Sequence, residues 1–396
     1  MRARSLRFTL VLGGAAALAG AANAQSAEPY TINVVLPLTG GAAFLGKAEQ
    51  LALQQYEKSL SGNGTTIKGR QIRFTFHDDQ SSPQTAVQLA TQISRSNPKP
   101  AIVLGSGVVA MCNAMAPVMR NGPVLYCFSP GMYPTVGSYA FSSSVATRDL
   151  AAVLLRYIGA RGWTRVALIT STDASGQDAL KNFKELLGQQ EHKSLQLVGE
   201  QNFNPTDVSA SAQIQRLKGS DPQVLIAWST GAPVGTVLKA IVDAGWDVPV
   251  ATTDGNMTYA QMSQYASVLP KQLFIPSPPW PKVDVPLFSA EIEKAKSSFF
   301  KAFDGSGIQP DGPSSFAWDP AVLAVHALTT LGPDATAEQV RDFLGKLTGF
   351  EGINGTYDFV KHPQRGLDES SVVITLWNPT KNAWDVVSKP GGLPLR

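Results

Sequence analysis

The chain has 396 residues and a formal net charge of +3, from 33 Lys or Arg and 30 Asp or Glu residues. Three arginines lie within the first seven residues, so the rest of the chain is close to neutral and has no basic cluster of the kind that binds nucleic acid. The two cysteines form no cysteine–histidine cluster that could hold a structural zinc, and the length suffices for two domains.

The first 24 residues have the pattern of a secretory signal peptide. The arginines precede an apolar stretch over residues 8–18, and Ala22-Asn23-Ala24 is a small-residue cleavage site. Gln25 follows that site, so no lipid-anchored cysteine is indicated. We therefore expect cleavage after Ala24 and export of the mature protein.

Predicted strands and helices alternate along the first third of the chain. Apolar runs predict strands over residues 32–36 and 72–77, and helical patterns follow them over residues 46–60 and 83–94. Buried parallel strands are typically continuous apolar runs rather than alternating patterns. This order is typical of a doubly wound α/β domain.

Residues 101–128 form the clearest βαβ unit. Apolar runs at 101–104 and 124–128 predict two strands, and an apolar-rich segment at 108–119 predicts the helix between them. Ligands of open α/β sheets bind beyond the carboxyl ends of the strands. The two candidate binding loops are therefore residues 105–109 and 129–133.

A nucleotide site is the main alternative for this unit. Gly105, Gly107 and Ala110 fit the G-x-G-x-x-A dinucleotide fingerprint. That fingerprint requires an acidic residue about 20 positions further on, and the next carboxylate, Asp149, comes far too late. We expect no cofactor. The glycines then either allow tight packing or let backbone N–H groups face a small ligand.

Cys112 and Cys127 lie in the same βαβ unit. The first is expected early in the helix and the second at the end of the following strand, so the two elements are neighbours. An even pair of cysteines in an oxidising compartment can form a disulfide. We expect the disulfide, with two buried free thiols as the alternative.

A second βα series begins near residue 145. Its predicted strands are 166–170, 195–200, 224–228 and 248–252, and its helical stretches are 150–158, 173–188, 207–217 and 234–242. Two consecutive series of similar length predict two doubly wound α/β lobes.

The remaining chain departs from this alternation. Prolines 276–281 predict a stiff connector. Helices are then expected at 286–303, 316–331 and 336–347, followed by extended segments at 356–359, 372–377 and 384–387. Helices without intervening strands suggest that the chain returns to the first lobe. Several crossings form a hinge, and a cleft between lobes is a preferred small-molecule site.

A set of motifs, in this order, resembles the leucine/isoleucine/valine-binding protein family. The motifs are VVLPLTGGAAFLGK (34–47), the run 105–117, SPGMYP (129–134), ATRD (146–149), TDASGQD (172–178), AWDP (317–320) and INGTYDF (353–359). These are type I periplasmic substrate-binding proteins of ABC importers. The resemblance covers nearly all of the mature chain.

The family implies two α/β lobes joined by a three-crossover hinge. The N-terminal lobe would comprise residues 28–144 and 280–353, and the C-terminal lobe residues 145–279 and 354–388. The resemblance further implies a periplasmic, monomeric protein without cofactor that passes a small-molecule ligand to a membrane permease.

The resemblance also carries over binding positions, residue by residue. Val109 stands where the family has a carboxylate-binding serine, Tyr133 replaces its threonine, and Ser175 replaces its tyrosine. Trp228 stands where a ligand-facing aromatic is expected, and Asp254 where an acidic residue commonly pairs with the ligand's ammonium. The full predicted set is Phe44, Leu45, Gly107, Val108, Val109, Met132, Tyr133, Ser175, Trp228 and Asp254.

The altered positions favour a less polar ligand. Valine cannot donate to a carboxylate, and large rings with a thioether suit an apolar or aromatic ligand body. We therefore expect a compact organic acid, either a hydrophobic amino acid or an aromatic or branched carboxylate. The alternatives are that these aromatic and Met side chains belong to the core and that Asp254 is a solvated turn residue.

Catalytic signatures are missing from the sequence. It contains no H-E-x-x-H, no G-x-S-x-G and no phosphate-binding loop. His77-Asp78-Asp79 has no third ligand nearby, so a solvated loop is favoured over a metal site. We predict a binding protein rather than an enzyme, with a sensing subunit for a membrane receptor and a secreted hydrolase as the alternatives.

Overall fold

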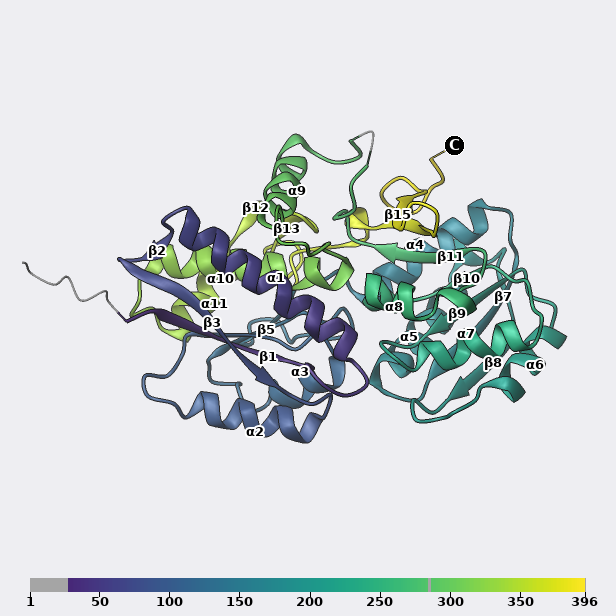
Figure 1. The fold of residues 1–396 in the computed structure, drawn as a ribbon, viewed down its shortest axis with the longest axis horizontal. Helices are drawn as coiled ribbons and strands as arrows, with labels where there is room; N and C mark the ends of the chain where they lie inside the picture. Colours follow the sequence, from purple (N-terminus) through teal and green to yellow (C-terminus); the bar gives the residue numbers. More distant parts are fainter. Residues whose placement is uncertain (1–27, 284–285, 396) are drawn as a thin grey trace, which may run out of the picture.

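The computed structural model describes residues 28–283 and 286–395, and these form two α/β lobes side by side (Figure 1). The predicted signal peptide lies outside the described residues. The predicted fold class is confirmed, because each lobe is built on a mostly parallel sheet with helices on both faces.

The first lobe contains a six-stranded sheet in the order β2-β3-β1-β4-β5-β6. Its strands are β1 (Tyr30–Leu36), β2 (Thr66–Ile67), β3 (Arg70–Asp78), β4 (Ile102–Gly105), β5 (Val124–Cys127) and β6 (Ala140–Ser142). All neighbouring pairs are parallel except β2 with β3. In the registered centre of the sheet, Val34 pairs with Phe76 on one side and Leu104 on the other.

The helices of the first lobe come from both ends of the chain. They are α1 (Ala43–Gly62), α2 (Pro83–Ser94), α3 (Val109–Met115), α9 (Ala290–Ala302), α10 (Gly312–Leu331) and α11 (Ala337–Gly345). Helix α10 is apolar on almost every face and buried along its length, and it packs against α1. A helix that is hydrophobic all round belongs in a core, so the lobe is completed only by residues after the second crossover.

The second lobe contains a seven-stranded sheet in the order β15-β14-β11-β10-β9-β7-β8. Its strands are β7 (Arg165–Ser171), β8 (Gln196–Phe203), β9 (Val224–Trp228), β10 (Val250–Ala251), β11 (Leu273–Ser277), β14 (Val373–Asn378) and β15 (Ala383–Val386). Only β14 and β15 run antiparallel to their neighbours. The α-helices are α4 (Thr147–Ala160), α5 (Ala174–Leu187), α6 (Ser211–Gly219), α7 (Val234–Asp243) and α8 (Tyr259–Gln264). Short 3-10 helices η1 (Gln190–His192), η2 (Asp254–Asn256), η3 (Ala266–Val268) and η4 (Glu369–Ser371) complete the elements.

Three crossovers join the lobes. The first lies between β6 and α4, and the second between β11 and α9. The third comes later than the predicted 353/354 boundary, because β13 (Gly355–Asp358) pairs with β12 (Thr348–Gly352) and stays with the first lobe. The phenol of Tyr357 donates to Asp319 Oδ2 of α10 over 3.1 Å, and Phe359 lies against Phe141. The chain therefore crosses between Phe359 and β14.

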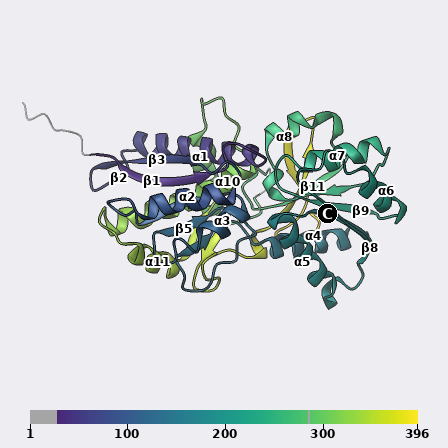
Figure 2. The same cartoon turned by 90° about the horizontal axis from the view of Figure 1, so that it is seen from below.

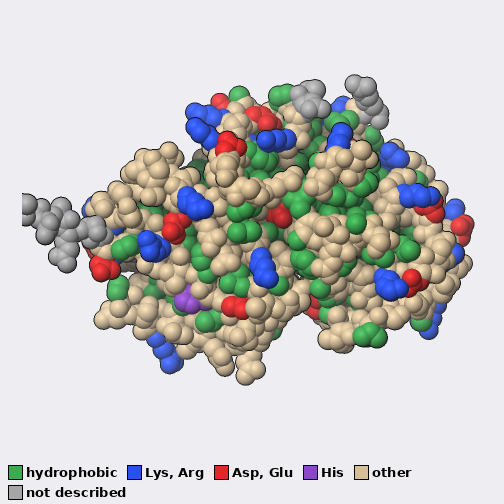
Figure 3. Space-filling model, viewed as in Figure 1, with side chains coloured by type: hydrophobic (Ala, Val, Ile, Leu, Met, Phe, Trp, Pro, Cys, Tyr) green, Lys and Arg blue, Asp and Glu red, His purple; other side chains and the backbone are tan. Residues whose placement is uncertain are grey.

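The surface shows no concentration of charge on the face drawn in Figure 3. In Figure 3, basic and acidic side chains are scattered over the face in view rather than gathered into one patch. Within residues 28–283 and 286–395, no helix is both long enough and apolar enough to cross a bilayer. In the same ranges, no three His, Cys, Asp or Glu side chains are grouped as metal ligands would be.

Candidate functional site between the lobes

Loops at the carboxyl ends of both sheets enclose a cavity between the lobes. Its volume is about 20 Å³, room for about one water molecule. It is lined by Leu45, Gly107, Val108, Val109, Ser129, Pro130, Gly131, Thr147, Ser175, Trp228, Thr230, Thr253, Asp254, Gly255 and Phe316. Of the larger hollows, one of about 810 Å³ beside α1, α9 and α10 lies within the first lobe, and one of about 430 Å³ lies between α9 and the second-lobe residues Tyr259 and Trp384, away from these loops. Parallel α/β sheets bind ligands at their carboxyl ends, so the small cavity is the candidate site.

The lobes are in contact around this cavity. The backbone N–H of Ala232 in the second lobe donates to the carbonyl of Gly41 in the first over 3.0 Å. Leu45 of α1 lies 3.5 Å from the position of a Cβ on Gly255. The structure is thus a closed arrangement of the two lobes, and a ligand larger than a water molecule enters only when they separate.

The loop after β4 forms the first-lobe wall. Gly107 lies so close to α1 that a Cβ there would be 2.1 Å from Leu45 Cδ2 and 2.2 Å from Glu49 Oε1. Only glycine fits this approach, which explains the glycine turn of the sequence. Val109 begins α3, and its side chain is 3.3 Å from the Cβ position of Gly131.

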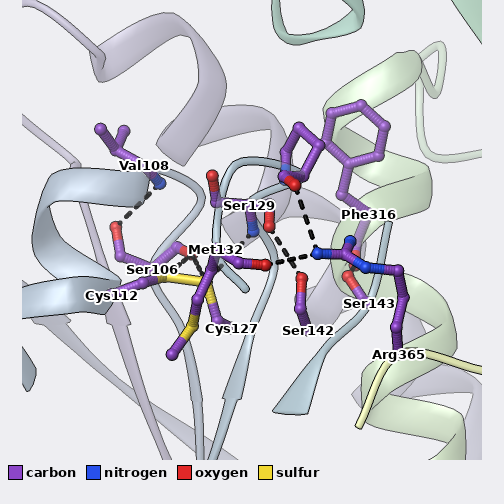
Figure 4. The surroundings of a disulfide bond; sticks show 11 residues. Ser106, Val108, Cys112, Cys127, Ser129, Met132, Ser142, Ser143, Phe316 and Arg365 are labelled. Atoms are coloured by element: carbon purple, nitrogen blue, oxygen red, sulfur yellow. Dashed lines mark hydrogen bonds between the residues drawn. A yellow bond between two sulfur atoms is a disulfide. The ribbon is translucent and has the colours of Figure 1, made fainter. Parts of the chain in front are cut away.

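A disulfide between Cys112 and Cys127 ties the two first-lobe loops together (Figure 4). Its sulfur atoms are 1.99 Å apart, and both residues are fully buried. Cys127 ends β5, and the backbone N–H of Phe128 donates to the carbonyl of Ser106 over 3.0 Å. The cross-link therefore fixes the loop after β4 relative to the loop after β5, where both border the cavity.

Asp254 is the charged group of the second-lobe wall. Its Oδ1 accepts from the hydroxyl of Thr253 over 3.0 Å, whereas its Oδ2 is buried and has no hydrogen-bond partner within the described residues. Burial raises the pKa of this carboxyl to about 7. Nearby, the hydroxyls of Ser175 and Thr230 are 2.9 Å apart.

The lining combines apolar side chains with hydroxyls and one carboxyl. Among the residues that line the cavity in the described part of the chain, Asp254 is the sole ionisable side chain. An unpaired buried carboxyl is costly unless it is protonated or meets a donor or cation. The cavity therefore has chemistry for an apolar ligand body with a polar, hydrogen-bond-donating group at Asp254.

Two more carboxyls lie buried just behind the first-lobe wall. Neither oxygen of Glu49 has a hydrogen-bond partner in residues 28–283 and 286–395. Burial, with smaller contributions from Asp79 and Asp311, raises the pKa of Glu49 well above its usual value. Burial also raises the pKa of Asp79 to about 6. Glu49 is thus a buried carboxyl beside the Gly107 loop whose charged form is disfavoured by burial.

The structure brings most of the predicted binding residues to the cavity. Those that line it are Leu45, Gly107, Val108, Val109, Ser175, Trp228 and Asp254. Met132 lies instead in the first-lobe core with Met111 and Met115, because its side chain turns inward from the loop. Tyr133 is 52% exposed, and Phe44 packs against Tyr265 with ring centres 6.3 Å apart. These three do not line the cavity.

Sequence reasoning missed several lining residues. Ser129, Pro130 and Gly131 lie in the predicted binding loop 129–133 but were left out of the predicted set of binding residues, and Thr253 was missed although it directly precedes Asp254. Phe316 comes from α10, nearly 200 positions after the first-lobe loops, and no local signal marks it.

Comparison with known proteins now identifies the family. Residues 29–374 match the family model described as "Periplasmic binding protein". The chain belongs to the periplasmic binding protein family. A comparison with curated protein sequences finds no match.

Solved structures of such binding proteins share the fold. The branched-chain amino acid transporter substrate-binding protein LivJ of Streptococcus pneumoniae, in complex with isoleucine, is 19% identical, with a TM-score of 0.75 over 91% of this chain and 99% of that one. An extracellular ligand-binding receptor from Rhodopseudomonas palustris HaA2 is 19% identical, with a TM-score of 0.78 over 91% and 100%. A solute-binding protein of an ABC transporter from R. palustris, in complex with benzoate, is 17% identical, with a TM-score of 0.72 over 91% and 95%. At these identities the likeness shows the fold alone.

Proposed function

We propose that this protein captures a compact organic acid between its lobes and delivers it to the permease of an ABC importer in the periplasm. The ligand class is a hydrophobic amino acid or an aromatic or branched carboxylate. The observation that carries the proposal is the interlobe cavity, where apolar side chains of both lobes surround the single carboxyl of Asp254. Solute-binding proteins of the same fold hold isoleucine and benzoate.

Ligand uptake requires hinge motion. The cavity of about 20 Å³ is far smaller than a leucine or a benzoate, and ligand sites for such molecules are typically several hundred Å³. Separation of the lobes at the three crossovers opens the cleft, and closure completes contacts from both sides. We infer binding without turnover, as in the periplasmic binding protein family to which the chain belongs.

Isothermal titration calorimetry with leucine, isoleucine, phenylacetate and benzoate tests this function. We expect at least one of them to bind with one site per chain and to be recovered unchanged. Saturable binding should also raise the melting temperature, because a ligand that binds only the native state stabilises it. Conversion of the ligand, or the absence of binding by all four, would contradict the proposal.

A further inference from the structure

The loop after β5 continues from the cavity wall to the second lobe. We call residues 129–134 the strap. Ser129, Pro130 and Gly131 line the cavity, and the backbone N–H of Thr147 donates to the carbonyl of Pro130 over 3.2 Å. Tyr133, further along the strap, is half exposed and does not reach the cavity. Its side chain contacts the second lobe instead.

One face of α5 follows the strap. Ser175, Asp178 and Asn182 are spaced i, i+3 and i+7, so they lie on the same side of the helix. Ser175 lines the cavity, and Asp178 Oδ2 is 3.2 Å from the Cβ position of Gly131. Asn182 Nδ2 donates to the phenol oxygen of Tyr133 over 3.2 Å. The contact between lobes thus runs continuously from the cavity to Tyr133.

The phenol oxygen of Tyr133 accepts a second hydrogen bond. Its donor is the backbone N–H of Arg148, over 3.3 Å. Arg148 lies in the first turn of α4, where backbone N–H groups have no partner within the helix. Both donors belong to the second lobe and the acceptor to the first, so these two bonds exist only while the lobes are closed.

Arg365 binds the backbone of the strap. It belongs to the third crossover and is buried, and its guanidinium donates to the backbone carbonyls of Ser144, Pro130 and Met132 (Figure 4 shows the Met132 bond). Its Cζ is 5.7 Å from the ring centre of Tyr133. Arg365 therefore links the strap to the first crossover, through Ser144, and to the third crossover, to which Arg365 itself belongs.

We propose that Tyr133, positioned by Arg365, determines how long the closed cleft retains its ligand without touching the ligand. This inference rests on the proposed function. A contact made only in the closed state shifts the open–closed equilibrium by its own free energy, and ligand affinity rises by the same factor for every ligand. Tyr133 should therefore change the affinity by the same factor whatever the chemistry of the ligand.

The variant Tyr133→Phe removes the acceptor and keeps the ring beside Arg365. Tyr139→Phe is the matched control, since Tyr139 also lies beside an arginine, Arg341, but within the first lobe. For each of leucine and benzoate that binds, we expect Tyr133→Phe to raise the dissociation rate and Kd about fivefold and by the same factor. The control should leave both unchanged. A factor that differs between the two probes, or no change, would overturn the proposal.

A double-mutant cycle tests whether Tyr133 acts through its hydrogen bond with Asn182. In an Asn182→Ala background, Tyr133→Phe should change Kd by a smaller factor than in the wild type, because one donor is already gone. Equal factors in the two backgrounds would mean that the two residues do not act together, which counts against the proposal.

Amide hydrogen exchange tests the same contact without a ligand. In ligand-free protein that alternates between the open and closed arrangements, the contact protects the Arg148 amide while the lobes are closed, so this amide should exchange faster in Tyr133→Phe than in the control, while core amides of α4 stay unchanged. If none of leucine, isoleucine, phenylacetate and benzoate binds, the proposed function fails and this measurement still stands. Equal exchange of the Arg148 amide in both variants overturns the closing contact, whether or not a probe binds.

Discussion

At the scale of single residues, the chemistry of the cleft depends on Asp254. Its Oδ2 is buried without a partner in the described residues, and burial raises its pKa to about 7, so the ligand-free protein holds a proton there below that pH. A ligand ammonium would supply the missing donor and charge. A simple carboxylate would meet a carboxyl that has to stay protonated.

We therefore expect Asp254→Asn to weaken leucine binding by at least about tenfold and to affect benzoate much less, because hydrogen bonds to charged groups contribute about 1.5–3 kcal/mol. Calorimetry on both ligands measures the difference. Asp243→Asn, which alters an exposed carboxylate paired with Lys239, is the control and should change neither affinity. Equal losses for both ligands would refute ammonium recognition.

Glu49 makes the stability of the protein depend on pH. Because burial raises its pKa in the folded state, the unfolded chain loses the proton first as pH rises. Folding stability is therefore unaffected well below pH 4.5 and falls as pH increases above it. Asp254 and Asp311, each with a pKa of about 7, act in the same direction up to that pH.

Glu49→Gln removes this proton linkage. In urea unfolding we expect the variant to equal the wild type at pH 4 and to gain stability relative to it as pH rises to 8. The exposed Glu291→Gln substitution should give no such trend. A constant difference between Glu49→Gln and wild type across the pH range would mean that Glu49 is ionised in the folded protein.

At the scale of elements, the disulfide connects α3 to the end of β5 across a separation of 15 residues. Closing a loop of this length stabilises the folded state by about 3 kcal/mol in the chain-entropy model. We expect no labelling by a thiol reagent in denatured, unreduced protein. Replacement of both cysteines by serine should lower the free energy of unfolding by about that amount and weaken ligand binding, since both cavity loops are loosened. Labelling of two thiols per chain would show that the pair is reduced.

The elements also show which features local sequence can reveal. The apolar runs of β4, β5, β7 and β9 predicted buried parallel strands, because a strand that is buried on both faces is a run of adjacent apolar residues. The pairing of β12 with β13 was not predicted, since the contact of Tyr357 with Asp319 that fixes it spans 38 positions. Because of that long-range contact, the third crossover lies later in the chain than predicted.

The candidate site was predictable to the extent that it lies at strand ends. Gly107 was predicted from its place after a strand, whereas Trp228 and Asp254 were predicted from the family resemblance, and all three line the cavity. Tyr133 and Met132 occupy a loop next to the cavity, where side-chain direction depends on α5 and on the first-lobe core. Sequence patterns therefore predict which residues lie near such a site more readily than they predict the direction of the side chains.

At the scale of the whole molecule, the closed lobes leave room for about one water, so binding must involve opening and closing. Small-angle X-ray scattering should therefore give a larger radius of gyration for ligand-free protein than for protein saturated with its ligand. The same radius in both states, at a ligand concentration far above Kd, would exclude hinge motion as the route of entry.

Helix α10 has a consequence for how the chain is made. The first lobe begins with β1 at Tyr30, yet its central helix is residues 312–331. During synthesis, the apolar face that α10 covers stays unprotected until more than three quarters of the chain has emerged. The sheet of the second lobe likewise stays incomplete until β14 has been synthesised. Contacts of such long sequence separation slow folding and expose apolar surface to aggregation. A chain truncated before α9 would carry a first lobe without α9, α10 and α11 and a second sheet without β14 and β15, so neither lobe would be complete.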